Sequence, residues 1–148
     1  MYKHILVSTD GSKLSLKAIK AAVNLAAAVG ARLSGVYVMP EYAPPVYGEA
    51  AMYLPEFSPK RFKEAVDKDA RAALAVAAKA AEGADLSFTS IKATDPQPWS
   101  AIIKTARAKK CDLIVMASHG RRGLSGLLLG SETTKVLTHS KVPVLVVR

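Results

Sequence analysis

The chain has little of several residue classes, and each shortage excludes something. It has a single cysteine, Cys111, so it cannot form an intramolecular disulfide. No apolar run approaches the roughly 20 residues that cross a membrane, and the N-terminus becomes polar too soon for a secretory signal. We therefore expect a cytoplasmic protein in a reducing compartment, with Cys111 as a small buried residue that precedes a strand.

Acidic residues are scarce relative to basic ones, 12 against 21, which gives a net charge of +9. This excess favours anionic ligands and raises the question of nucleic-acid binding. Several lysines, however, recur at helical spacing on one face, as Lys13, Lys17 and Lys20 do. No basic run is interleaved with aromatic residues, and no zinc-ligand spacing occurs. We therefore expect nucleic-acid binding to be absent.

The 148 residues predict one globular domain, 1–148, because 50% are apolar and 22% charged. Aliphatic runs predict five strands, at residues 4–9, 33–39, 85–93, 113–117 and 142–147. Apolar periodicity predicts four helices, one after Ser12 to about residue 29 and the others at 59–82, 99–109 and 132–139. In the first helix, the inward stripe is predicted to be Leu16, Ile19, Val23, Ala26 and Val29, with Gly30 as the terminator.

Alternation of strands and helices predicts an open, parallel, doubly wound α/β sandwich of Rossmann-like type. The third strand alternates polar residues and should lie near an edge. The segment Pro40–Ser58, rich in proline and aromatic residues, breaks the pattern. It is either a surface excursion over its own domain, a lid over a ligand, or a contact with a partner.

The stretch from Asp112 to Thr134 holds the strongest functional signal. A buried strand is followed by a loop with Gly120, Gly123, Gly126 and Gly130, and then by Ser131, a favourable N-cap for the next helix. Strand, glycine loop and helix N-terminus together favour an anion site. The stretch matches neither the P-loop nor the dinucleotide fingerprint, so a plain flexible connection is the alternative.

Ligands of such sheets lie beyond the carboxyl ends of the strands. Those ends carry Ser8, Thr9 and Asp10 after the first strand, Val38 in the second, and Met116 to Gly120 after the fourth. Asp10 either contacts a ribose or a metal beside phosphates, or it serves only the turn before the first helix.

Three segments resemble the universal stress protein family, and the likeness covers essentially the whole chain. They are residues 5–12, residues 112–120, and Gly130-Ser131 followed by residues 141–147. The nucleotide-binding branch of that family has Gly-x2-Gly-x9-Gly-(Ser/Thr). Gly120, Gly130 and Ser131 match it, whereas Ala117 stands at the first glycine. If that position needs a positive φ, Ala117 would weaken binding; in an ordinary conformation little would be lost.

The resemblance implies an adenine-nucleotide-hydrolase-like fold with strand order 3-2-1-4-5, and ATP or AMP as ligand, alone or with Mg²⁺. The base would lie near Asp10 and Val38, and the ribose near Ser8, Thr9, Met116 and Ala117. Phosphates would lie on the backbone of Gly120, Gly130, Ser131 and Glu132, with the hydroxyls of Ser131 and Thr133 assisting. Arg121 and Arg122 would add charge or be plain solvated arginines, Asp10 would hold any Mg²⁺, and His119 would have no catalytic role.

The expected function is a stress-response regulatory protein that binds an adenine nucleotide, with weak hydrolysis at most. One alternative is a slow Mg-dependent ATPase. The lack of a recognisable general base near the expected phosphates argues against it. The other is a nucleotide-free interaction domain, in which Ala117 marks lost binding. The resemblance also implies a homodimer joined along Val142–Val147, an aliphatic strand suited to edge pairing.

Overall fold

The computed structural model describes residues 1–44, 53–120 and 129–148. It contains a five-stranded sheet with the order β3-β2-β1-β4-β5, in which every pair is parallel. The predicted fold class, strand order and edge position of the third strand are therefore confirmed. The strands are β1 (His4–Ser8), β2 (Arg32–Met39), β3 (Phe88–Thr94), β4 (Leu113–Ala117) and β5 (Val144–Val147).

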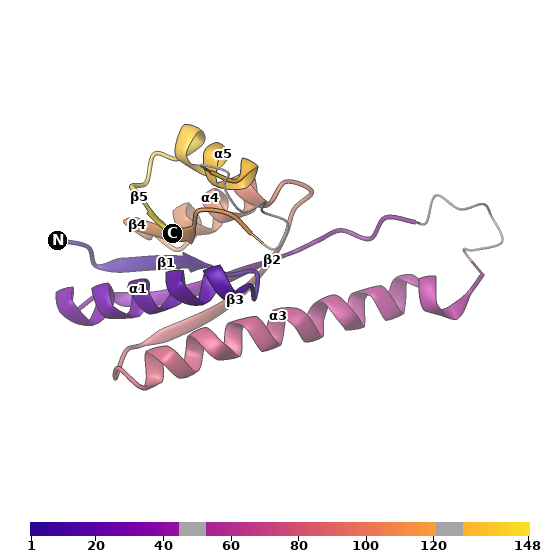
Figure 1. The fold of residues 1–148 in the computed structure, drawn as a ribbon, viewed down its shortest axis with the longest axis horizontal. Helices are drawn as coiled ribbons and strands as arrows, with labels where there is room; N and C mark the ends of the chain where they lie inside the picture. Colours follow the sequence, from indigo (N-terminus) through magenta and orange to yellow (C-terminus); the bar gives the residue numbers. More distant parts are fainter. Residues whose placement is uncertain (45–52, 121–128) are drawn as a thin grey trace.

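Within the described residues, four α-helices cover the two faces of the sheet (Figure 1). They are α1 (Lys13–Val29), α3 (Pro59–Glu82), α4 (Pro98–Ala108) and α5 (Ser131–His139). α1 and α3 lie on one face, and α4 and α5 lie on the other. Side chains alternate between these faces along each strand, so β1 is buried on both sides and reads as a continuous aliphatic run.

α1 begins and ends where the sequence predicts. The Ser12 hydroxyl accepts the backbone N–H of Ser15, and Gly30 adopts φ +68° and donates to the carbonyl of Ala26. The predicted inward stripe was wrong at Leu16, whose side chain is 43% exposed. The predicted Ile19, Val23 and Ala26 are buried, and the buried face also includes Ser15, Ala18 and Ala22. The three alanines of this face, Ala18, Ala22 and Ala26, allow α1 to approach the strands closely.

Two predicted strand starts were early. The predicted third strand began at Asp85, but Asp85 has φ +52° and lies in a turn held by a bond from the Leu86 N–H to the carbonyl of Ala81. The last strand begins at Val144 rather than Val142, because the Ser140 hydroxyl both donates to the carbonyl of Val142 and accepts its N–H. A backbone bond before β3 and the Ser140 side chain before β5 therefore close short turns where sheet pairing was predicted.

The segment between β2 and α3 lies partly within the described structure. It contains a 3-10 turn, η1 (Pro55–Phe57), and Ser58 caps α3 by accepting the N–H of Arg61. The Tyr42 hydroxyl donates to the carbonyl of Phe57 over 2.8 Å, and its ring meets Phe62 edge-on at 5.4 Å. The described ends of Pro40–Ser58 thus pack against their own chain. Residues 45–52 lie outside the described residues, and the lid and partner hypotheses stay predictions.

At the amino ends of the strands, Asp112 joins β1 to the turn before β4. Its carboxylate accepts the backbone N–H groups of Lys3 and His4 over 2.8 and 3.0 Å. Cys111, beside it, is buried as predicted, and burial raises the pKa of its thiol to about 11. A thiol of this kind is unreactive at neutral pH.

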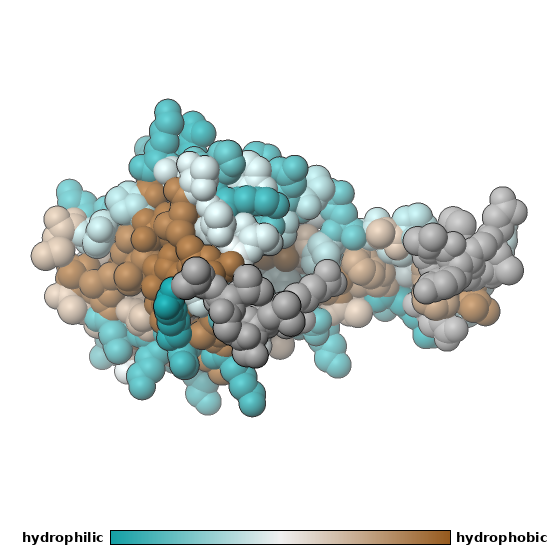
Figure 2. Space-filling view, turned by 45° about the horizontal axis from the view of Figure 1, so that its top comes forward, coloured by the Kyte–Doolittle hydropathy of each residue, from teal (hydrophilic) through white to brown (hydrophobic). Residues whose placement is uncertain are grey.

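β5 forms one edge of the sheet. Leu145 on this strand is 39% exposed, and Leu137 on the neighbouring α5 is 41% exposed. Figure 2 shows an apolar strip, in brown, on the side of the molecule where β5 and the C-terminus lie in Figure 1. Among the described helices, none is both long and apolar enough to span a bilayer.

Candidate functional site

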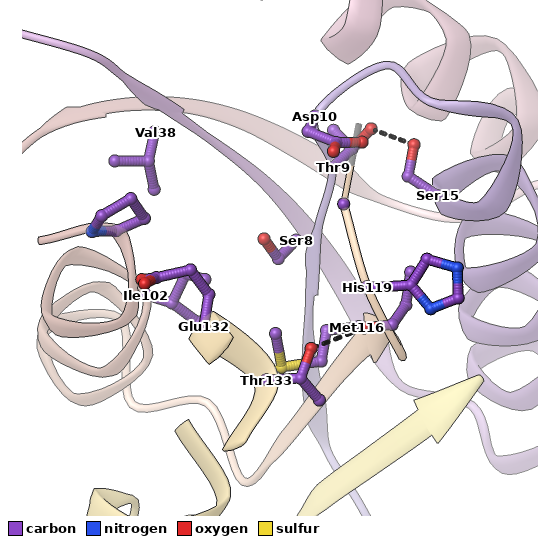
Figure 3. Close-up of a pocket in the computed structure, with 13 residues that line it drawn as sticks. Ser8, Thr9, Asp10, Ser15, Val38, Ile102, Met116, His119, Glu132 and Thr133 are labelled. Carbon is purple, nitrogen blue, oxygen red and sulfur yellow. Dashed lines mark hydrogen bonds between the residues drawn. The ribbon is translucent and has the colours of Figure 1, made fainter. Parts of the chain in front are cut away.

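A cavity of about 240 Å³ lies at the carboxyl ends of β1, β2 and β4 (Figure 3). It includes nine of the twelve predicted site residues, namely Ser8, Thr9, Asp10, Val38, Met116, Ala117, Gly120, Glu132 and Thr133. Gly130 and Ser131 lie at the start of α5 without lining the cavity. Arg121, with Arg122, Gly123 and Gly126, lies outside the described residues.

The turn after β1 is held by its own side chains. The Thr9 hydroxyl accepts the N–H of Gly11 and lies 3.1 Å from the hydroxyl of Ser15, and one oxygen of Asp10 accepts the N–H of Ser12 over 2.9 Å. Asp10 therefore does shape the turn before α1, and it also lines the cavity. The two roles proposed for Asp10 from the sequence are compatible.

Gly120 lies directly against Asp10. A Cβ built on Gly120 would meet the second carboxylate oxygen of Asp10 at 2.8 Å, which is closer than real Cβ contacts. The glycine therefore allows the chain that leaves β4 to pass beside the turn that leaves β1. This close approach explains a glycine here without any need for a positive φ.

Gly130 closes the glycine-rich loop onto its own beginning. Its N–H donates to the carbonyl of Ser118 over 2.7 Å, and an added Cβ would lie 3.1 Å from the Cα and Cβ of His119. Gly130 is the N-cap residue of α5, without a side-chain cap, and Ser131 is the first helical residue. The prediction that Ser131 caps this helix was therefore wrong by one position, and a side chain at the true cap would crowd His119.

Ala117 is the last residue of β4 and pairs with Val147 of β5. Non-glycine residues with positive φ in the described structure are Asp85 and Lys110, so Ala117 has an ordinary extended backbone. Its side chain packs with Val7 and Val115 in the core on the α1 side. The substitution of alanine at this motif position therefore imposes no backbone strain.

Glu132 ties the two helices that frame the cavity. One carboxylate oxygen accepts the backbone N–H of Trp99, in the first turn of α4, over 2.8 Å, and the other lies 3.3 Å from the ammonium of Lys135. The Trp99 ring is half-buried against the core and stacks on His139 with centroids 4.7 Å apart. Glu132 thus offsets the positive end of the α4 dipole.

Sequence reasoning missed four lining residues, which are Ser15, Pro98, Ile102 and His119. Ile102 and Pro98 belong to α4 and form an apolar wall with Val38 and Met116. Ile102 carried a usable signal, because it lies on the inward stripe of its helix. Ser15 carried none, since a serine on the predicted helix does not stand out from its sequence neighbours.

Comparison with known proteins gives one consistent result. A profile described as the universal stress protein family matches residues 1–148. The chain is 34% identical to the universal stress protein MJ0531 of Methanocaldococcus jannaschii, over 100% of this chain and 83% of that protein. It is also 34% identical to the universal stress protein YxiE of Bacillus subtilis, over 100% of both chains. The chain belongs to the universal stress protein family.

Solved structures agree with this assignment to the universal stress proteins. The hypothetical protein MJ0577 of Methanocaldococcus jannaschii superposes with a TM-score of 0.80 at 28% identity, over 99% of this chain and 96% of that one. A universal stress protein in complex with cAMP superposes with a TM-score of 0.72 at 27% identity, over 99% and 97% of the two chains.

The charges of the cavity in this universal stress protein are uneven. Two carboxylates, Asp10 and Glu132, are among its described lining residues, whereas lysine and arginine are absent from that set. His119 also lines the cavity, and its Nδ1 lies 3.1 Å from the hydroxyl of Ser118. The described residues include no cluster of three or more His, Cys, Asp or Glu side chains arranged to hold a metal.

Proposed function

We propose that this universal stress protein binds an adenine nucleotide in the cavity at the carboxyl ends of β1, β2 and β4, and that binding serves a regulatory role in a stress response. The observation that carries the proposal is the composition of the cavity. One wall is apolar, the turn after β1 presents hydroxyls and a carboxylate, and Gly120 lies at the cavity together with the first turn of α5. A base, a sugar and a phosphate need these three surroundings in turn.

The base would lie against the apolar wall of Val38, Pro98, Ile102 and Met116. The ribose would lie near Ser8, Thr9 and Asp10, whose hydroxyls and carboxylate can exchange hydrogen bonds with sugar hydroxyls. The phosphate would bind the backbone N–H groups of Ser131 and Glu132, because the first turn of a helix leaves such donors without intrahelical partners. The N–H of Gly130, which the sequence also suggested, already donates to the carbonyl of Ser118. The related protein in complex with cAMP supports an adenine ligand.

Mg²⁺ fits this proposal only as a companion of the nucleotide. Mg²⁺ commonly binds one or two carboxylates together with phosphate oxygens and water. Asp10 can supply one carboxylate at the cavity, and the described residues offer no complete metal cage. We therefore propose Asp10 as a ligand of nucleotide-bound Mg²⁺, with charge neutralisation as the contribution of the ion.

Binding without efficient hydrolysis is the chemistry that these residues favour. His119 supplies the imidazole among the described lining residues, and its Nδ1 lies 3.1 Å from the Ser118 hydroxyl, which occupies that nitrogen. The nucleotide-free interaction domain was suggested by Ala117, and the ordinary backbone of Ala117 removes that argument. We also propose a homodimer through Val142–Val147, supported by the exposed apolar edge of β5.

Ser8 offers the sharpest test, because its side chain lies in the middle of the cavity (Figure 3). Ser8→Leu should fill the cavity and weaken AMP and ATP binding by roughly tenfold or more in calorimetry, since steric exclusion removes the site. Ser8→Ala leaves the space open and serves as the matched control. Nucleotide should also be released, near one per chain, when the purified protein is denatured. Binding that survives unchanged in folded Ser8→Leu would contradict the proposed site.

A further inference from the structure

We propose that Glu132 makes this site select adenine ligands by charge, so that adenosine and AMP bind better than metal-free ATP. The inference rests on the proposed nucleotide function and concerns the specificity of the same cavity. Glu132 is the residue that would determine the preference. The preference would follow from the position of its carboxylate, from the fixed orientation of that side chain and from the charges around it.

The position of Glu132 places a carboxylate beside the expected phosphate donors. Glu132 is the second residue of α5, and its backbone N–H belongs to the first helical turn, whose donors point out of the helix end. The side chain also lines the cavity. A phosphate bound at this helix end would therefore lie near a negative charge that belongs to the same residue as one of its donors.

The carboxylate is not free to turn away. It accepts the N–H of Trp99 at the start of α4 over 2.8 Å, and that helix end has no side-chain cap of its own from Gln97. Movement of Glu132 toward solvent would leave the Trp99 N–H without this acceptor and would remove a favourable interaction with the α4 dipole. The chain therefore holds the charge at the wall of the cavity.

The surrounding charges do not reverse its effect within the described structure. Figure 3 shows Asp10 and Glu132 on opposite sides of the cavity, with Ser8 between them. Lys135 lies 3.3 Å from Glu132 and offsets part of its charge, but half of the lysine side chain is exposed to solvent. Repulsion grows with the charge of the ligand. Adenosine is therefore unaffected by Glu132, AMP is affected moderately and ATP most.

The test compares three ligands in the presence of EDTA. Glu132→Gln keeps an oxygen that can accept the Trp99 N–H but removes the charge. We expect it to raise the affinity for ATP about tenfold, to raise that for AMP less, and to leave that for adenosine unchanged. Lys135→Met should do the opposite and lower ATP affinity relative to adenosine. Titration calorimetry at low ionic strength, where charge effects are largest, measures all three.

Glu82→Gln is the matched control, because it changes the net charge equally at the exposed end of α3, by the opposite edge of the sheet. It should leave the ratio of ATP to adenosine affinity unchanged. If Glu132→Gln shifts all three affinities equally, or none, the selectivity proposal fails while the nucleotide site stands. If the wild-type protein binds none of the three ligands, both the proposed function and this inference fail.

Discussion

The Thr133 hydroxyl donates a hydrogen bond to the carbonyl oxygen of Ala117 over 3.0 Å, and both residues are buried. The bond joins the first turn of α5 to the last residue of β4 across the base of the glycine-rich loop. A hydroxyl in this place thus has a structural partner already, whatever the loop binds. If Thr133 also assists phosphate binding, as the sequence suggested, its hydroxyl must serve the phosphate while it donates to Ala117.

Replacement of Thr133 by valine should measure that bond. Valine preserves the shape of the side chain but leaves the Ala117 carbonyl without this donor, so the free energy of unfolding should fall by about 1–2 kcal/mol. Thr133→Ser retains the hydroxyl and should cost less. Urea unfolding of the three proteins provides the comparison. Equal losses for valine and serine would show that packing of the methyl group matters and the hydrogen bond does not.

Gly130 and Gly83 form a natural pair for a second prediction, since both have negative φ. Gly130→Ala would press a methyl group against His119 and the Ser118 carbonyl, and should lower stability by about 1–3 kcal/mol. Gly83→Ala meets its neighbours at ordinary contact distances, 3.5 Å or more, and should change stability by less than about 1 kcal/mol. Thermal unfolding would check both. A harmless Gly130→Ala would mean that the loop closure can relax.

His4 should make stability depend on pH. Burial, reinforced by the charge of Arg32, holds the pKa of His4 below its ordinary value of 6.5. The unfolded chain takes up a proton near 6.5 while the folded chain resists it. Stability should therefore fall as the pH drops below that value, and level off below the lowered folded pKa.

His4→Gln isolates this effect, because glutamine cannot titrate and its amide can still reach Ser34, the partner of His4 at 2.8 Å. Denaturant unfolding of both proteins across about pH 5 to 8 gives the difference in the free energy of unfolding. The wild-type advantage should shrink as the pH falls. Parallel curves for the two proteins would contradict the assigned role of His4.

Leu145 tests the proposed homodimer. Leu145→Lys places a charge on the outer edge of β5, where a partner strand would pair, and should convert dimer to monomer at micromolar concentration. Leu16→Lys is the matched control, since Leu16 has a similar exposure, 43% against 39%, on a different element. Light scattering measures the mass. A wild-type monomer, or a Leu145→Lys dimer, would contradict pairing along this edge.

The order of strands and helices could be predicted because β1, β4 and β5 carry aliphatic runs, β3 alternates apolar and polar residues, and each helix has an apolar period. The errors share a cause. Leu16, Asp85 and Val142 each lie where a neighbouring element or a hydrogen bond within a short turn decides the outcome, and hydrophobic pattern alone does not contain those contacts.

Most of the candidate site could be predicted for a topological reason, since parallel strands bring Ser8, Val38 and Met116 to one edge. The environment of Glu132 could not. Its partner Trp99 lies 33 residues away on another helix, and nothing in either local sequence indicates that they meet. The sequence likewise contained Gly120 and Gly130 without their neighbours, which are the Asp10 carboxylate for Gly120 and the His119 backbone for Gly130.

The contact of Asp112 with Lys3 and His4 has a consequence for how the chain reaches this structure. The bonds connect residues 109 and 108 positions apart, and β1 pairs with β4 only after most of the chain exists. Long-range closure of this kind slows folding, because loop entropy is lost before the contacts form. During synthesis, β1 must therefore wait with one side unpaired. Because the cavity exists only once β4 lies beside β1, a ligand can stabilise that final pairing but cannot start the folding of the earlier strands.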